Sequence, residues 1–127
     1  MPLLNDLYAN DNGFSGTLPQ SITAPLNDLL LQYNRLTGSI PSSLALLPGI
    51  QLLSVGQNCL VGSLPTEFAS TLSLEVLVVN NNTLTGTLPS GLFTLPALRV
   101  LSVNTNAFKG ALLPSRAILC TAVALID

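Results

Sequence analysis

The stretch LNDLLLQYNRLTGSIPSSLALL, Leu26 to Leu47, holds one complete repeat unit. Apolar residues stand eight, five, and three places before an asparagine, and a leucine, a glycine and an Ile-Pro pair follow it: Leu26, Leu29, Leu31, Asn34, Leu36, Gly38, Ile40 and Pro41. The spacing before the asparagine predicts a short strand with one buried face. The glycine and proline predict bends on a return path, where a strand cannot continue.

The same unit recurs along the chain in register. The asparagines are spaced by 22, 24, 24 and 24 residues, and a large apolar residue and then a glycine follow each of them: Asn12, Asn34, Asn58, Asn82 and Asn106. One unit of this length cannot cover its own apolar face, whereas stacked units share a continuous core. The sequence therefore predicts a solenoid of about five coils, with short parallel strands on one side and an irregular or 3₁₀ return path.

The recurring asparagine has a structural explanation. The chain must turn inward after each strand, which leaves backbone N–H and C=O groups without a partner in the sheet. An amide side chain both donates and accepts hydrogen bonds, and each bond lost in the interior costs about 1–3 kcal/mol. We therefore predict that all five asparagines form a buried ladder that holds the fold and performs no chemistry.

The pattern L-x-x-L-x-L-x-x-N-x-L-x-G-x-I/L-P, complete in residues 26–47, resembles the plant-type extracellular leucine-rich repeat. That family includes receptor-like kinase ectodomains and inhibitors of secreted polygalacturonases. Clear repeats span residues 4–114, and residues 115–127 fit a degenerate last coil of a single array, 1–127. The resemblance implies strands on the concave side of a curved solenoid, a second short strand in each coil, an extracellular or cell-surface location, and protein or peptide partners.

Two features of the ends shape our expectations. The cysteine-bearing caps of the family are missing, so the terminal coils should expose their leucines and the chain is expected to be an uncapped fragment. Residues 1–10 have no basic start and no long apolar core, so we expect no signal peptide in this chain. Any attachment to a membrane would depend on sequence outside it.

Composition argues against several classes of function. Only 8% of the residues are charged and the net charge is −2, which offers no basic face for nucleic acid. Histidine, the commonest general base and metal ligand, is absent. Glu67 and Glu75 are isolated on different parts of the repeat. We therefore expect a non-enzymatic protein with no catalytic, cofactor or metal site.

Partner binding should depend on the strand residues that point away from the core. We predict the following set: Asp6, Tyr8, Asp28, Leu30, Tyr33, Leu52, Val76, Val78 and Val100. Asp6 and Asp28 would be neighbours on adjacent strands, an unfavourable pairing that suggests a cationic partner. Exposed apolar residues at 52, 76 and 100 suggest a protein contact, although β-branched side chains also simply suit strands. An amide-rich rim lies beside this column.

Two covalent features can also be examined. Asn81-Asn82-Thr83 is the only N-x-S/T glycosylation acceptor in the chain, and Asn81 is expected on the outward side of the strand end. Cys59 and Cys120 are two coils apart, about 10 Å at strand spacing. Because that exceeds the ~7 Å limit for the Cα atoms of a disulfide, we expect no internal bridge.

The leading functional prediction is a module that recognises a protein or peptide in a receptor-like ectodomain. The first alternative is a secreted inhibitor of a cell-wall-degrading enzyme. The second is an array that binds ice or polysaccharide, suggested by hydroxyl residues at one position of the return path: Thr17, Ser39, Ser63 and Thr87. That column breaks at Ala111.

Overall fold

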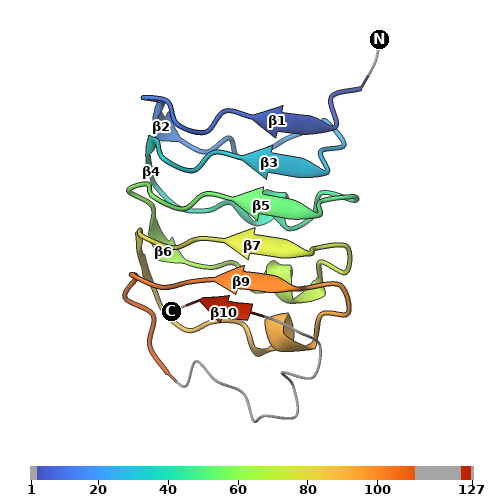
Figure 1. Ribbon diagram of the computed structural model, residues 1–127, viewed down its shortest axis with the longest axis vertical. Coiled ribbons are helices and arrows are strands. Elements are labelled where there is room, and N and C mark those ends of the chain that lie inside the picture. Colours follow the sequence, from blue (N-terminus) through green and yellow to red (C-terminus); the bar gives the residue numbers. More distant parts are fainter. Residues whose placement is uncertain (1–2, 111–123, 127) are drawn as a thin grey trace.

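Each repeat forms one coil of a solenoid, and its strand joins a parallel sheet that runs the length of the stack (Figure 1). The computed structural model describes residues 3–110 and 124–126. In this part of the chain six strands form the sheet, in the order β1 (Asp6–Tyr8), β3 (Asp28–Leu30), β5 (Leu52–Ser54), β7 (Val76–Val78), β9 (Val100–Ser102) and β10 (Ala124–Ile126). The predicted leucine-rich repeat solenoid with short parallel strands is confirmed.

The register of this sheet follows directly from the repeat. The central residues of the strands are partners across the whole stack, in the series Leu7, Leu29, Leu53, Leu77 and Leu101. Leu53 and Leu77 are fully buried. Because side chains alternate across a strand, a central leucine that points into the core turns the residues on both sides of it outward.

A second set of strands lies on the return path. β2 (Ser15–Thr17) pairs with β4 (Arg35–Thr37), and β6 (Val61–Ser63) pairs with β8 (Thr83–Thr85). The expected second strand of each coil is therefore present in the first four coils. Only an isolated bridge between Ser39 and Val61 links the two pairs among the described residues.

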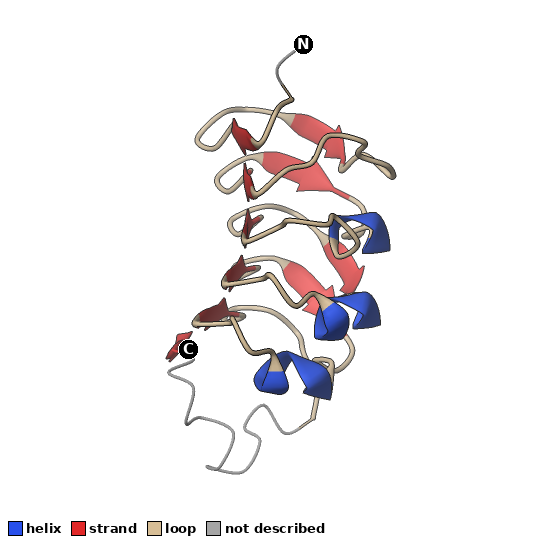
Figure 2. Cartoon of the chain, turned by 90° about the vertical axis from the view of Figure 1, so that its right-hand side faces the viewer, coloured by secondary structure: helices blue, strands red, loops and turns tan. Residues whose placement is uncertain are grey.

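Prolines mark the start of a 3₁₀ helix in three coils. Pro41, Pro65 and Pro89 precede η1 (Ser42–Leu44), η2 (Thr66–Ser70) and η3 (Ser90–Thr94). Proline has a fixed φ and no N–H to leave unpaired, which suits this position. Each helix buries an apolar side chain in the core, among them Leu44 and Phe68. Figure 2 shows the helices on the side opposite the six-stranded sheet.

The first coil contributes apolar residues that remain in contact with solvent. Leu4 is 52% exposed and Phe14 53%, whereas the equivalent Leu74 and Leu84 are fully buried. No described coil lies beyond the first one to cover them. Most of the predicted degenerate coil, 115–127, falls outside the described residues, except that β10 pairs in parallel with β9.

Candidate partner-binding face

The outward side of the six-stranded sheet, here called the concave face, carries no helix among the described residues (Figure 2). The sheet register arranges its side chains in two columns. One column is Asp6, Asp28, Leu52, Val76 and Val100, and the other is Tyr8, Leu30, Ser54, Val78 and Ser102. All nine predicted partner-binding residues except Tyr33 therefore lie in these columns.

Asparagine side chains hold the rim of this face in place. Asn58 Oδ1 accepts a hydrogen bond from the backbone N–H of Leu36 at 2.9 Å. Its Nδ2 donates to the carbonyls of Leu31 and Val55, both at 3.0 Å. Asn34, Asn82 and Asn106 make the same set of bonds in their own coils. Each of these amides joins its own turn to the preceding coil.

Asn12 differs from the other four asparagines. It is exposed, and its Nδ2 donates only to its own turn, at the carbonyls of Ala9 and Asn10. No coil precedes it within the described residues, so it has no neighbouring backbone to join. The prediction of a buried ladder residue is therefore wrong at Asn12.

The residue before each ladder asparagine has a left-handed backbone conformation, with φ between 52° and 59°: Asp11, Tyr33, Gln57, Asn81 and Thr105. This region is uncommon for residues other than glycine, and holding one there costs about 1–3 kcal/mol. Hydrogen bonds between coils hold the turn, as from the Tyr33 N–H to the Gly56 carbonyl at 3.1 Å. As a result Tyr33 stands at the rim of the concave face, 55% exposed.

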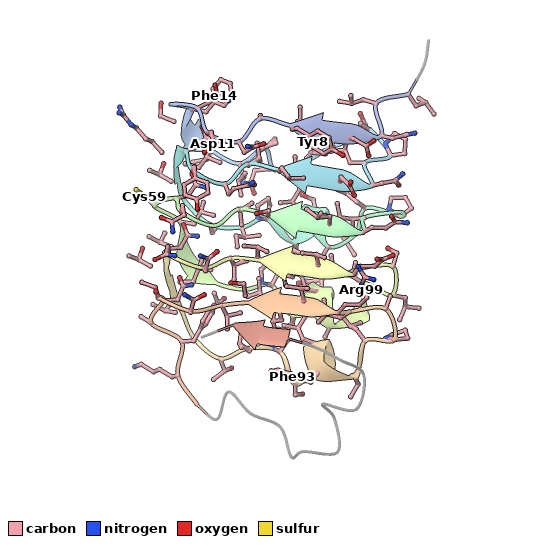
Figure 3. The ribbon with its side chains drawn as sticks, in the orientation of Figure 1. Tyr8, Asp11, Phe14, Cys59, Phe93 and Arg99 are labelled. Carbon is pink, nitrogen blue, oxygen red and sulfur yellow. The ribbon has the colours of Figure 1, made fainter. Side chains whose placement is uncertain are left out.

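The first two coils make the concave face acidic. Asp6 and Asp28 are partners in the sheet register, and the Tyr8 hydroxyl donates to Asp28 Oδ2 at 3.1 Å. Figure 3 shows Tyr8 on β1, in the first coil. That hydrogen bond, with smaller effects of burial and of the charges of Asp28 and Asp6, raises the pKa of the Tyr8 phenol. The one ion pair between described residues joins Arg99 and Glu75, so neither aspartate has a cationic partner there.

The middle coils form a hollow of about 330 Å³ that we call the amide groove. It is lined by uncharged residues only: Gln32, Tyr33, Ser54, Gln57, Val78, Asn80, Val100 and Ser102. Ser54 and Ser102 are each 6% exposed and lie low beside the larger Val78 on the strand between them. The amide oxygen Oε1 of Gln32 is buried and has no hydrogen-bond partner among the described residues.

Comparison with known proteins matches both the repeat and the solenoid. The family model described as Leucine Rich Repeat matches residues 25–47 and 73–95. The chain folds as a leucine-rich repeat solenoid. No curated protein sequence matches it.

Solved plant ectodomains share the shape of this leucine-rich repeat solenoid. The GASSHO1/SCHENGEN3 receptor kinase ectodomain of Arabidopsis thaliana, crystallised with CASPARIAN STRIP INTEGRITY FACTOR 2, matches 98% of the chain at 31% identity and a TM-score of 0.86. The Arabidopsis HAESA ectodomain, in complex with an extended IDA peptide hormone, matches 96% at 28% identity and a TM-score of 0.88. The BIR2 ectodomain of Arabidopsis thaliana matches 82% of the chain at 34% identity and a TM-score of 0.77. The chain spans 15%, 21% and 56% of these three proteins.

Some sites of this leucine-rich repeat solenoid remain predictions. Asn81 is half-buried in its turn, and the Thr83 hydroxyl of the same acceptor motif donates to the Leu60 carbonyl at 2.9 Å. Glycosylation of Asn81 stays a prediction. Cys59 is exposed. Cys120 lies outside the described residues, so the expected absence of a disulfide between the two cysteines stays a prediction.

The hydroxyl column of the return path has a packing role. A Cβ on Gly38 would lie 2.9 Å from Thr17 Cγ2, and one on Gly86 would lie 3.2 Å from Ser63 Cβ. Each hydroxyl-bearing residue thus packs against the glycine of the next coil. Thr17 lies in β2 and Ser63 in β6, and these strands belong to two separate two-stranded sheets. Among the described residues, no continuous sheet therefore runs along the hydroxyl column.

Sequence reasoning noted an amide-rich rim but did not include Gln32, Gln57 or Asn80 in the partner-binding set. Their shared signal is position, one or two residues before a ladder asparagine. Within residues 3–110 and 124–126, no cluster of three Cys, His, Asp or Glu side chains could hold a metal ion. No helix in that part of the chain has the length and hydropathy needed to cross a bilayer.

Proposed function

We propose that this array is a non-catalytic recognition module of an extracellular, receptor-like ectodomain, and that it binds an extended peptide or protein segment on its concave face. The observation that carries the proposal is the face itself. Its strands keep one register over the stack, so their outward side chains form continuous columns that no described helix covers. A surface already formed before binding loses little entropy on ordering.

Relatives support the choice of partner. Of the similar ectodomains, those of GASSHO1/SCHENGEN3 and HAESA were crystallised with CASPARIAN STRIP INTEGRITY FACTOR 2 and with an IDA peptide hormone. The matched segment in each case covers nearly all of the present chain. Peptide binding by this chain is the simplest function that uses the same solenoid in the same way.

The charges and exposure of the face indicate which partner fits. Asp6 and Asp28 would favour a basic side chain at the first two coils, because an opposite charge relieves their mutual repulsion. The exposed Tyr8 and Tyr33 offer aromatic contact area, and tyrosine is enriched at energetically important interface positions. The half-buried Leu52, Val76 and Val100 add a low apolar strip. The proposed partner is therefore basic at one end and uncharged along the rest.

A peptide selection tests this function. Random linear peptides displayed on phage are selected against the whole chain, and the enriched sequences are synthesised. We expect Val76→Asp to weaken their binding about tenfold or more, with an unchanged circular dichroism spectrum. Leu72→Asp is the matched control, because Leu72 is 67% exposed and belongs to the loop after η2, outside the concave face.

Two results would contradict the proposal. Selected peptides that bind Val76→Asp at full strength but fail on Leu72→Asp would move the site to the other side of the solenoid. A selection that enriches no peptide against the chain would argue against peptide recognition altogether.

A further inference from the structure

The amide groove differs chemically from the acidic end of the same face. Its three amides, Gln32, Gln57 and Asn80, and its two low serines can donate and accept hydrogen bonds, but no lining residue is charged. Moving a charged side chain from water into such a place without a partner carries a large cost. The groove therefore favours a ligand segment that is neutral but rich in hydrogen-bonding groups.

One atom of a groove residue lacks the partner that a buried polar group normally has. Among the described residues, only Gln32 Oε1 and Ser43 Oγ are buried side-chain atoms without a hydrogen bond, and Ser43 belongs to η1. A buried unpaired acceptor destabilises the fold, which is why most such atoms are satisfied. Because this oxygen is closed off from solvent, a donor from outside the chain can reach it only after the Gln32 side chain turns outward, a movement that breaks no hydrogen bond of the oxygen.

Three features of the groove indicate what that donor is. Side-chain amides match the peptide group, since each has one carbonyl acceptor and N–H donors. The volume of about 330 Å³ is at the small end of ligand pockets, so it holds a short segment and not a whole ligand. Val78 and Val100 add an apolar wall beside the amides.

Resting on the proposed function, we propose that the amide groove binds the main chain of an uncharged, extended stretch of the partner peptide. In the complex the Gln32 side chain turns outward and its Oε1 accepts a hydrogen bond from a peptide N–H. The amides of Gln57 and Asn80 bond to neighbouring peptide groups, and a small apolar side chain lies against Val78 and Val100. The amide groove thus selects a ligand segment for its main-chain hydrogen-bonding groups and its lack of charge. Charge recognition is confined to the first two coils.

Gln32→Met is the decisive variant, because methionine keeps the shape of glutamine and removes the unpaired acceptor. We expect it to weaken the selected peptides about tenfold and to leave the melting temperature unchanged or higher. A purely structural glutamine would instead lower the melting temperature when replaced. Gln51→Met is the control, since Gln51 is exposed and outside the groove.

Backbone methylation of the same synthetic peptides locates the donor. Replacing one peptide N–H at a time by N–CH₃ should weaken binding at a position within an uncharged stretch, and this loss should largely disappear in Gln32→Met. Gln57→Met gives a second groove variant, with the same expected direction, should Gln32→Met fold poorly.

The outcomes separate this inference from the proposed function. Suppose that the selected peptides bind Val76→Asp weakly but bind Gln32→Met and Gln57→Met at full strength. That result would refute the role of the amide groove and leave binding on the concave face intact. Peptides that tolerate Val76→Asp as well would overturn both. A charged residue at the methylation-sensitive position, or a lowered melting temperature in Gln32→Met, would also refute the proposed role of the groove.

Discussion

Asn82 Oδ1 accepts a hydrogen bond from the backbone N–H of Leu60, 2.9 Å away and one coil earlier in the stack. Asn82 Nδ2 also donates to the carbonyls of Val55 and Val79, and Asn82 is only 8% exposed. The side chain therefore satisfies three backbone groups of two coils at once. Asn58 and Asn106 bond backbone groups of two coils in the same way, on either side of Asn82 in the stack.

We expect Asn82→Ala to lower the free energy of unfolding by about 3 kcal/mol, because it leaves buried backbone groups unpaired. Asn12→Ala should cost less than about 1 kcal/mol, since Asn12 is exposed and bonds only within its own turn. Urea unfolding followed by circular dichroism measures both. If both variants lost the same free energy of unfolding, the asparagine bonds between coils would add no stability beyond that of bonds within one turn.

Gly38 gives a second prediction about stability. Its φ is 77°, and an added Cβ would lie 2.9 Å from Thr17 Cγ2, so alanine would meet both backbone strain and a close contact. We expect Gly38→Ala to lower the melting temperature, with a loss of about 1–3 kcal/mol. Gly13→Ala is the control, because a Cβ there would have no atom within 4 Å. A neutral result at Gly38 would mean that Thr17, in the preceding coil, shifts to make room.

The repeat made the scaffold predictable, but local details depended on neighbouring coils. Leucine, asparagine and glycine recur in fixed positions, so the strand order and register follow from spacing alone. Ser54 occupies the same outward position as Tyr8, yet Ser54 is 6% exposed and Tyr8 is 61% exposed. The difference arises because Leu30 and Val78 flank Ser54 on adjacent strands. A single unit of sequence does not contain that information.

The left-handed turn was equally hidden from the sequence. Its position is occupied by residues of five different types and never by glycine, namely Asp11, Tyr33, Gln57, Asn81 and Thr105. Only the fixed distance to the next residue, the ladder asparagine, connects them. Backbone hydrogen bonds between coils accompany the conformation, as from the Asp11 N–H to the Gln32 carbonyl at 3.0 Å, even where the next asparagine makes no bond to another coil.

Tyr33 has a φ of 59°, a backbone conformation that is costly for residues other than glycine. Glycine adopts a positive φ freely, so Tyr33→Gly should keep or raise the stability by up to about 1 kcal/mol. The same change should weaken the selected peptides, because it removes the aromatic wall of the amide groove. Thr105→Gly relieves the same strain at φ 54° outside the groove and is the matched control for binding. If Tyr33→Gly binds as well as the wild type, the exposed ring has no role in recognition.

Titration of Tyr8 tests the geometry of the acidic end. The hydrogen bond to Asp28 raises the pKa of the Tyr8 phenol above its ordinary value of 10.0. Because the pKa is higher in the folded state, the associated stability is present below pH 10 and is lost as the pH rises through the folded value. The ultraviolet absorbance of tyrosinate, compared between wild type and Tyr8→Phe, should show this late-titrating phenol. In Asp28→Asn the phenol should titrate at lower pH, since the carboxylate acceptor and its charge are gone. An unchanged titration in Asp28→Asn would place the Tyr8 hydroxyl away from Asp28 and remove the evidence for a built acidic end.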